Sequence, residues 1–433
     1  MNTNQINWDH MPGEENIVQA KLPNGIKILC KTDYLSPTVI ISGYLQGGSI
    51  LDPSEKLGLA LFTSYALMRG TKRQSSRQLY HNLESCGASF GFGASVQSTS
   101  FGGKALVEDF PLIIDTLAAC LLQPTFPPDQ IHRLKMQILT GLQLREQDTV
   151  EMASLCFDKN LFPNHPYGTP EDGYIDTVQR IMPRDLNDFH QKFYGPQGMV
   201  IVIVGAIESN AAIDLIMEKL GYWENPNWQA TPEIPEIPEI KKSLTVFIPL
   251  AEKFQVDIIM GCHGPARTSP DFLAASLGNN ILGQFGMMGR IGEVVREKSG
   301  LAYYASTSLN AMAHGGSWEI AAGVNPANFD AAVSIIKDEL IRFITEPVSE
   351  DELLDAKFSY IGSIPLSVES NSAVAGAIVR MERFGLGLNY LHLFPKLVDS
   401  ISAEDILMTA QKYLNLDKLI VVGCGPTPAN YNG

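Results

Sequence analysis

The strongest constraint on the fold is an internal duplication, in which matching segments lie about half of the 433-residue chain apart. Residues Ile181–Tyr194 read IMPRDLNDFHQKFY and Ile401–Leu414 read ISAEDILMTAQKYL, with Ile, Asp, Gln and Lys matching at a constant spacing of 220 positions (401 − 181). Each segment leads into a β-branched run that contains glycine at its end, Met199–Gly205 and Leu419–Gly423. A repeat this long predicts two copies of one domain rather than a solenoid of short units.

An earlier pair of segments repeats in the same way. Phe110–Leu142 has the pattern of a helix, a proline break and a second helix that opens at Pro128. Phe329–Gly362 has the same order, with a helix start predicted at Ser349. The repeat therefore covers helices as well as strands.

A proline-rich segment separates the two copies. Asn225–Ile240 contains three Pro-Glu-Ile units, and proline at every third position favours extended polyproline II over helix. We therefore expect a first domain over residues 1–224, a linker over 225–240 and a second domain over 241–433.

Strand and helix patterns come in blocks within the first half. We expect a hairpin at Val18–Leu22 and Ile26–Lys31, a strand at Thr38–Leu45, an apolar helix at Leu57–Met68, a helix near Ser75–Cys86 and a strand pair over Ser89–Leu106. Two helices and a final strand complete the unit. This order predicts an α+β fold, in which each domain is a largely antiparallel sheet with helices packed on one face.

Composition excludes several kinds of partner. Asp and Glu number 47 against 32 Lys and Arg, and the net charge of −15 disfavours both nucleic acid and an anionic membrane surface. No apolar run reaches the 18 residues of a membrane span, and the polar N-terminal segment lacks the features of a secretory signal. The six cysteines form no C-x-x-C pair. We expect a cytoplasmic protein with reduced thiols.

One motif connects the sequence with a known family. Gly58–Thr71 reads GLALFTSYALMRGT, which resembles the G-x-A-H-x-x-E-H-M-x-F-x-G-T motif of the pitrilysin/insulinase (inverzincin) family of zinc peptidases. Gly58, Ala60, Gly70 and Thr71 match this motif. The resemblance extends over nearly the whole chain and implies the two-domain fold of processing peptidases.

The zinc-binding core of that motif is absent. In the family, two histidines bind zinc and a glutamate acts as general base, and the corresponding positions here are Leu61, Ser64 and Tyr65. The third ligand of the family falls at Gly141–Leu142, neither of which is a carboxylate, and Glu146 comes about a turn too late. An asparagine of the family's edge strand is replaced by Gly91. The resemblance therefore implies a degenerate site, and we expect no cofactor in this chain.

The second half keeps a family signature. Leu282–Tyr303 reads LGQFGMMGRIGEVVREKSGLAY and is similar to the family's R-E-x-x-G-L-x-Y pattern. The resemblance implies that Arg296 and Tyr303 contact the substrate and the tetrahedral intermediate beside the zinc of another half. A guanidinium and a phenol are suitable donors to an oxyanion. An isolated pair with this spacing has a simpler interpretation, namely a surface arginine and a core tyrosine.

A glycine-rich stretch precedes that pair. Gly283, Gly286 and Gly289 lie where non-catalytic processing-peptidase subunits carry a glycine-rich loop that contacts the substrate. The resemblance implies substrate contact here too, while a plain break between a helix and a loop is the alternative.

The resemblance implies a non-catalytic subunit of a heterodimeric zinc metallopeptidase. A homologous partner with an intact H-x-x-E-H would supply zinc and base, and this chain would supply Arg296, Tyr303 and half of a chamber for peptide substrates. One alternative is a purely structural or peptide-binding pseudopeptidase. Another is a hydrolase with a different centre, but the sequence shows no nucleophile or metal constellation for it, and Cys262-His263 lacks a third catalytic partner.

Overall fold

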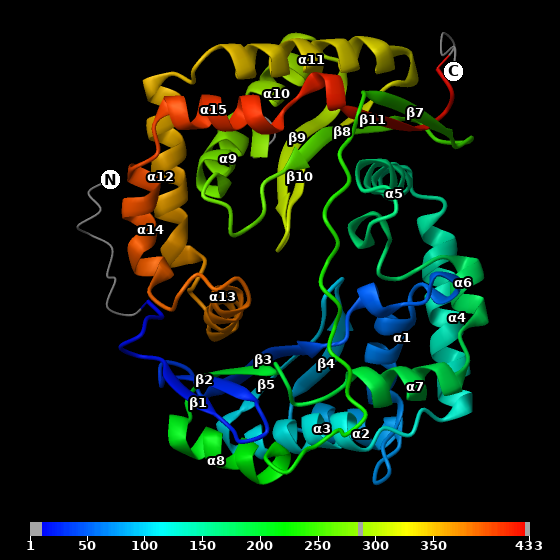
Figure 1. Cartoon of the computed structure of the whole chain (residues 1–433), viewed down its shortest axis with the longest axis vertical. Helices are drawn as coiled ribbons and strands as arrows, with labels where there is room; N and C mark the ends of the chain where they lie inside the picture. Colours follow the sequence, from blue (N-terminus) through cyan, green and yellow to red (C-terminus); the bar gives the residue numbers. More distant parts are fainter. Residues whose placement is uncertain (1–10, 285–288, 429–433) are drawn as a thin grey trace.

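Two β-sheets lie on opposite sides of the molecule (Figure 1), in a computed structural model that describes residues 11–284 and 289–428. The first sheet has the order β1-β2-β6-β3-β5-β4 and the second β7-β11-β8-β10-β9. The strands of the first sheet are β1 (Val18–Lys21), β2 (Lys27–Thr32), β3 (Thr38–Gln46), β4 (Ser89–Ala94), β5 (Ser98–Leu106) and β6 (Val200–Gly205). Those of the second are β7 (Leu244–Pro249), β8 (Val256–Gly264), β9 (Ala302–Ala311), β10 (Gly316–Val324) and β11 (Ile420–Gly425).

The strand pairings confirm the α+β fold with two related units. β6 runs parallel to β2 and antiparallel to β3, and β11 runs parallel to β7 and antiparallel to β8. The two central strands thus occupy equivalent places in their sheets, as the matching segments before them predict. The remaining pairs along each sheet are antiparallel.

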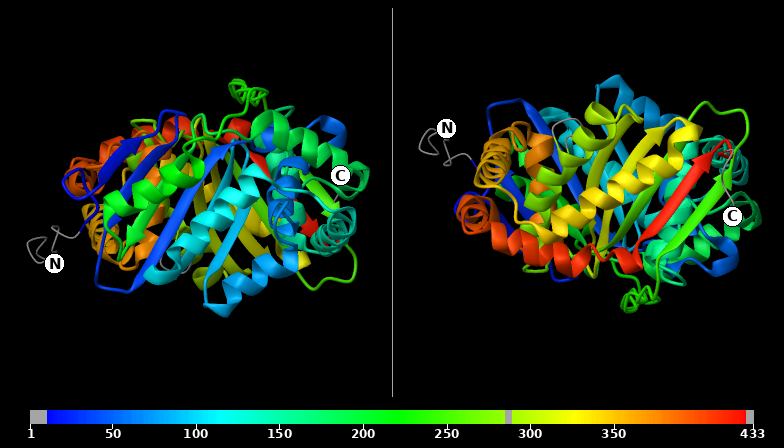
Figure 2. Two further views of the ribbon diagram at one scale, coloured as in Figure 1. Left: turned by 90° about the horizontal axis from the view of Figure 1, so that it is seen from below. Right: turned by 90° about the horizontal axis from the view of Figure 1, so that it is seen from above.

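Helices flank both sheets. The first half contains α1 (Leu59–Ala66), α2 (Ser76–Ser85), α3 (Phe110–Leu122), α4 (Pro128–Arg145), α5 (Thr149–Leu161), α6 (Ile175–Arg180), α7 (Pro183–Phe193) and α8 (Ser209–Leu220). The second contains α9 (Phe272–Asn279), α10 (Arg290–Gly292), α11 (Phe329–Thr345), α12 (Glu350–Leu366), α13 (Asn371–Arg383), α14 (Tyr390–Asp399) and α15 (Ala403–Tyr413). Figure 2 shows helices on the outer side of each sheet, α3 and α8 on the first and α11 on the second. Residues 225–240 have no helix or strand and pass from the lower to the upper half in Figure 1.

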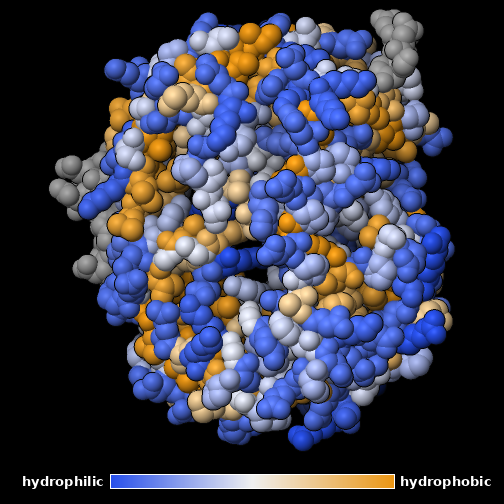
Figure 3. Space-filling model, viewed as in Figure 1, coloured by the Kyte–Doolittle hydropathy of each residue, from blue (hydrophilic) through white to orange (hydrophobic). Residues whose placement is uncertain are grey.

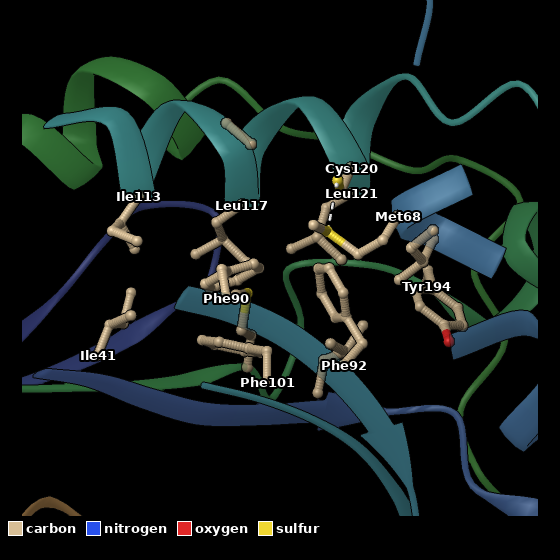
Figure 4. Close-up of a cluster of buried hydrophobic side chains, with 14 of the residues drawn as sticks. Ile41, Met68, Phe90, Phe92, Phe101, Ile113, Leu117, Cys120, Leu121 and Tyr194 are labelled. Atoms are coloured by element: carbon tan, nitrogen blue, oxygen red, sulfur yellow. Dashed lines mark hydrogen bonds between the residues drawn. The ribbon is translucent and has the colours of Figure 1, made fainter. Parts of the chain in front are cut away.

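The outer face of the first sheet carries a large apolar core. Ile113, Leu117 and Leu121 recur every fourth residue on α3, so they form one stripe on the helix, and all three are fully buried. Figure 4 shows this stripe facing the strands, where the rings of Phe90 and Phe92 meet edge to face with centroids 5.2 Å apart.

The inner face of the same sheet is covered by a helix from the other half of the chain. Side chains alternate along a strand, so Ile201 and Ile203 of β6 join the outer core while Val202 and Val204 point inward. The inward side chains pack with Ile378 and its neighbours on α13. α13 belongs to the second half, and Figure 1 shows it lying over the first sheet.

The reverse arrangement covers the second sheet. Phe157 and Leu161 of α5, a helix of the first half, pack with Ile259, Ile420 and Val422 of β8 and β11. The sequence pattern indicates helices on one face only and two helices after β5, whereas α5, α6 and α7 all follow α4. Each sheet is therefore covered on both faces, once by its own half and once by the opposite half.

No helix within the described ranges is both long enough and apolar enough to cross a lipid bilayer.

We predict that Phe157→Ala lowers the free energy of unfolding by ~3–5 kcal/mol, because the ring is 1% exposed and its removal leaves a cavity between α5 and the second sheet. Urea denaturation followed by circular dichroism measures the change. Leu144→Ala, on the neighbouring α4 and 69% exposed, is the control and should change stability by less than about 0.5 kcal/mol. The two halves share α5, so one transition should shift as a whole, and a split into two transitions would contradict this account.

Candidate functional site

The degenerate motif lies on α1, and Gly58, which matches the motif, has a structural role. The sequence predicts a helix from Leu57, but α1 begins at Leu59 because Gly58 adopts a left-handed conformation with φ of +97°. A side chain at this position would also place its Cβ 2.8 Å from the carbonyl oxygen of Asp172. The carboxylate of Asp52 accepts hydrogen bonds of 2.8 Å from the backbone N–H groups of Gly58 and Ala60. Gly58 and Ala60, two of the matching residues of the motif, therefore shape the start of the helix.

Of the three positions of the former zinc core, one is buried inside the helix and two face a cavity. Ser64 is fully buried, and its hydroxyl donates to the carbonyl of Leu61 at 2.7 Å. Leu61 and Tyr65, one helical turn apart, line a cavity of about 600 Å³, and Tyr65 is 41% exposed. The side chain of Leu61 has no donor atom, and the hydroxyl of Ser64 is used inside the helix.

The cavity lies between the two halves of the chain. α1 forms one wall, and α5 contributes a second wall with Ser154, Leu155 and Asp158. The far ends of β9 and β10 supply Asn310 and Glu319. The reciprocal packing of α5 on the second sheet thus brings residues from both halves into one cavity.

Carboxylates dominate the charge of this cavity. Burial, followed by the charges of Glu319 and Glu171, raises the pKa of Asp158 to about 7. Burial also raises the pKa values of Glu171 and Glu319. Arg145 lies at the same wall, but it is paired with Asp172 and the carbonyl of Gly173. Protons and cations are therefore favoured in this cavity over anions.

The donor set does not fit the family's zinc ion. Leu142, at the expected place of the third ligand, is 2% exposed in the apolar core, and the adjacent Gly141 has no side chain. Glu146 is exposed at the end of α4 and does not line the cavity. Within the ranges that the structure describes, no three His, Cys, Asp or Glu residues lie close enough to hold a metal ion. Catalytic zinc requires three protein ligands, so no reaction step at this site is assigned to a metal.

The retained pair lies at and just before the start of β9. Arg296 belongs to the helical turn Glu293–Lys298 after α10, and its side chain is 41% exposed, with its Nε 3.9 Å from Glu297. Tyr303 is the second residue of the edge strand β9 and is 60% exposed. Its neighbour Tyr304 points to the other face and donates to buried Asp257 at 2.7 Å.

The structure does not bring this pair to the degenerate motif. Tyr303 lies near the start of β9, while the cavity beside Leu61 and Tyr65 is lined by Asn310 near the end of that strand. A strand rises about 3.3 Å per residue, so the two places are about 23 Å apart. Tyr303 is therefore not part of the cavity beside the degenerate motif, and neither is Arg296.

The two ends of the glycine-rich stretch pack closely against each other. Gly283 and Gly289 are buried, and a Cβ at Gly289 would lie 2.2 Å from the Cα of Gly283. Glycine is therefore required where these two backbone segments meet. Gly286 lies outside the described residues, and substrate contact by all three glycines stays a prediction.

The sequence interpretation missed the acidic residues of the cavity. Asp158 lies on α5, a helix that was not expected, and Glu319 comes from the other half. The signal for α5 was present, because Ala153, Phe157 and Leu161 recur every fourth residue as one buried face. No local sequence pattern could indicate that Asp158, Glu171 and Glu319 line the same cavity.

Comparison with protein-family models agrees with this geometry. Residues 27–170 match the model of "Insulinase (Peptidase family M16)", and residues 180–360 match that of "Peptidase M16 inactive domain". The chain belongs to the insulinase family, peptidase family M16. The second match falls on the half that carries Arg296 and Tyr303.

Similar M16 proteins differ in the activity that their names state. The non-peptidase homolog YmxG of Helicobacter pylori is 24% identical over 400 residues, covering 90% of this chain and 89% of that protein. An uncharacterized zinc protease of Mycobacterium leprae is 22% identical over 400 residues, covering 92% of this chain and 89% of that protein.

Solved structures show the same fold. A peptidase M16 inactive domain from Pseudomonas fluorescens superposes with a TM-score of 0.88 at 27% identity, covering 96% of this chain and 99% of that one. A protease from Helicobacter pylori gives 0.89 at 18% identity, over 96% and 100% of the two chains. The inactive-domain model, the non-peptidase homolog and the Pseudomonas fluorescens structure together support a pseudopeptidase.

We predict that the chain loses stability as pH rises from about 4 to 7. The folded-state pKa of Asp158 lies above its unfolded value of 3.8, so the folded state holds the extra proton in this interval. The contribution is full below pH 4 and is lost as pH passes about 7, on the order of 2 kcal/mol for a partly exposed group. Urea denaturation at several pH values measures this slope.

The substitution Asp158→Asn should reduce the slope rather than abolish it, because burial also raises the pKa of Asp52 to about 7 and the pKa values of Glu171 and Glu319. Asp338→Asn, on the exposed face of α11, should leave the slope unchanged. An equal slope in the Asp158 variant would show that the cavity does not hold this proton.

We also predict that the purified chain binds no stoichiometric zinc, because Leu61 and Leu142 cannot coordinate a metal. Elemental analysis after dialysis against zinc measures this directly. One tightly bound equivalent would contradict the assignment of a degenerate site.

Proposed function

We propose that this chain is a non-catalytic subunit of a heterodimeric zinc metallopeptidase that acts on peptides. In this proposal a homologous partner with an intact H-x-x-E-H holds the zinc and the base. This chain supplies Arg296 and Tyr303 to the partner's site, together with half of the substrate chamber.

The observation that carries the proposal is the separation of the two functional elements. The motif on α1 has lost its donors. Arg296 and Tyr303 are solvent-accessible on the turn Glu293–Lys298 and on β9, and Tyr303 lies about 23 Å along that strand from Asn310, which lines the cavity. These two hydrogen-bond donors are exposed, and the described residues place no metal site beside them. They are therefore available to contact another chain. A guanidinium and a phenol stabilise the negative charge of a tetrahedral intermediate.

An open strand edge supports peptides as substrates. β4 is the last strand of the first sheet, and its outer edge has no strand partner among the described residues. An extended peptide pairs readily with such an edge through its backbone. Gly91, in the middle of β4, has no atom within 4 Å of the position of a Cβ, so its surroundings leave room for a bound chain.

Exposed apolar residues on the outer surface of the second half favour the presence of a partner chain. Leu354 and Phe358 of α12 and Leu393 and Leu397 of α14 are exposed apolar residues. Figure 3 shows apolar side chains gathered along this edge of a mostly hydrophilic face. Patches of this kind are typical of protein–protein contacts.

A purely structural or peptide-binding pseudopeptidase is the second candidate. The match to the inactive-domain model and the similarity to a non-peptidase homolog favour it. It requires no exposed donor pair, so the effect of removing that pair distinguishes the two candidates.

We predict that Arg296→Ala and Tyr303→Phe lower the kcat of the reconstituted pair of chains by about 100-fold and about 10-fold, because each removes a donor to the oxyanion. Peptide hydrolysis by this chain mixed with its H-x-x-E-H partner measures kcat, and size-exclusion chromatography checks that the complex still forms. Lys298→Ala is the matched control, since Lys298 lies on the same turn with a 63% exposed side chain. Unchanged kcat in both variants, with an intact complex, would reject the contribution in trans and leave the structural candidate.

A further inference from the structure

A second cavity, of about 540 Å³, lies between α12, α13 and α14, apart from the degenerate motif and the exposed pair. These helices form the left side of the molecule in Figure 1. Two arginines, Arg267 and Arg380, line the cavity, and no acidic residue does. The cavity therefore has a net positive lining in a chain whose net charge is −15.

Arg267 is held in place by aromatic side chains, and no carboxylate among the described residues pairs with it. Its guanidinium carbon lies 4.1 Å from the ring centroid of Phe272, and it donates to the hydroxyl of Tyr390 at 3.3 Å. Stacking on aromatic rings fixes the plane of a guanidinium and leaves its remaining N–H groups available. Arg267 therefore presents an ordered positive charge to the cavity.

Arg380, on α13, has no side-chain hydrogen bond or ion pair with any other residue that the structure describes. Burial and, second, the charge of Arg267 lower its pKa. Elsewhere in the chain, Arg145, Arg180 and Arg290 are paired with carboxylates. Two neighbouring arginines without an acidic partner repel each other, and a bound anion would relieve this repulsion.

The rest of the lining is suited to an apolar group. Met381, Leu391 and Phe394 form part of the wall, and the ring of Phe394 stacks parallel to Tyr360 with centroids 6.5 Å apart. Ser359 and Ser363, one turn apart on α12, contribute only small side chains and so leave space. The volume lies in the range of small-molecule sites, which combine apolar walls with a few polar anchors.

We propose that this cavity binds an organic carboxylate, with the carboxylate between Arg267 and Arg380 and an apolar chain against Met381, Leu391 and Phe394. The carboxylate can come from the C-terminus of a peptide or from a fatty acid, because both join the same anion to an apolar body. The inference does not depend on the contribution of Arg296 and Tyr303 to a partner.

Calorimetric titration of the full chain with four probes tests the proposal. The probes are an N-acetylated pentapeptide ending in leucine, its C-terminal amide, decanoate and inorganic phosphate. We expect at least one of the two carboxylate probes to bind, and we expect the amide to bind at least about 10-fold more weakly than the free-acid peptide if the peptide binds. Binding of the peptide alone, or of decanoate alone, identifies the source of the carboxylate.

Variants locate the binding. Arg380→Gln should weaken carboxylate binding at least about 10-fold, and Ser363→Leu, an exposed helix position that faces the cavity, should block it by filling the space. Lys396→Gln removes one positive charge from exposed α14 outside the cavity lining and should leave the affinity unchanged.

Three results would overturn the proposal. The first is binding of neither carboxylate at about 5 mM. The second is binding of the amide or of phosphate as tightly as of the carboxylates. The third is undiminished binding by both the Arg380 and the Ser363 variants.

Discussion

The packing of one helix from each half against the sheet of the other half is the interaction on which the rest of the structure depends. α5 covers the inner face of the second sheet through Phe157, and α13 covers the inner face of the first through Ile378. Either half alone would expose a sheet face rich in valine and isoleucine to water. Exposing apolar surface costs a free energy of about 25 cal/mol for each Å². The halves are therefore fixed relative to each other, and so are both cavities.

Some positions of the motif are required by the packing of the M16 fold, and others are required only for zinc chemistry. Gly58 takes a left-handed conformation against the backbone of Asp172, and any side chain there would clash. Leu61 and Tyr65 face a cavity instead, where a change of side chain disturbs little packing. Loss of the zinc donors therefore leaves the fold intact, while the glycine at the start of α1 is retained.

The charge of each cavity is set by the residues that packing brings to its lining, and not by the net charge of the chain. The cavity beside α1 collects Asp158, Glu171 and Glu319 and favours protons, whereas the cavity between α12, α13 and α14 collects Arg267 and Arg380 and favours anions. The overall −15 disfavours a polyanionic partner such as nucleic acid, but it does not predict the field inside either cavity.

The sequence by itself determined the duplication, most strands and helices of the first half and the absence of zinc donors at Leu61, Ser64 and Tyr65, because these follow from residue identity and short-range periodicity. Only the tertiary structure decided that α5 packs on the second sheet and α13 on the first. It also decided that the charge of Glu319 acts on Asp158, and that of Arg267 on Arg380. It also placed Tyr303 near the start of β9, while Asn310 at the other end of that strand lines the cavity beside the former zinc motif. Each of these depends on contacts between segments far apart in the chain, which are selected by the burial of whole sheet faces and leave no local pattern in the sequence.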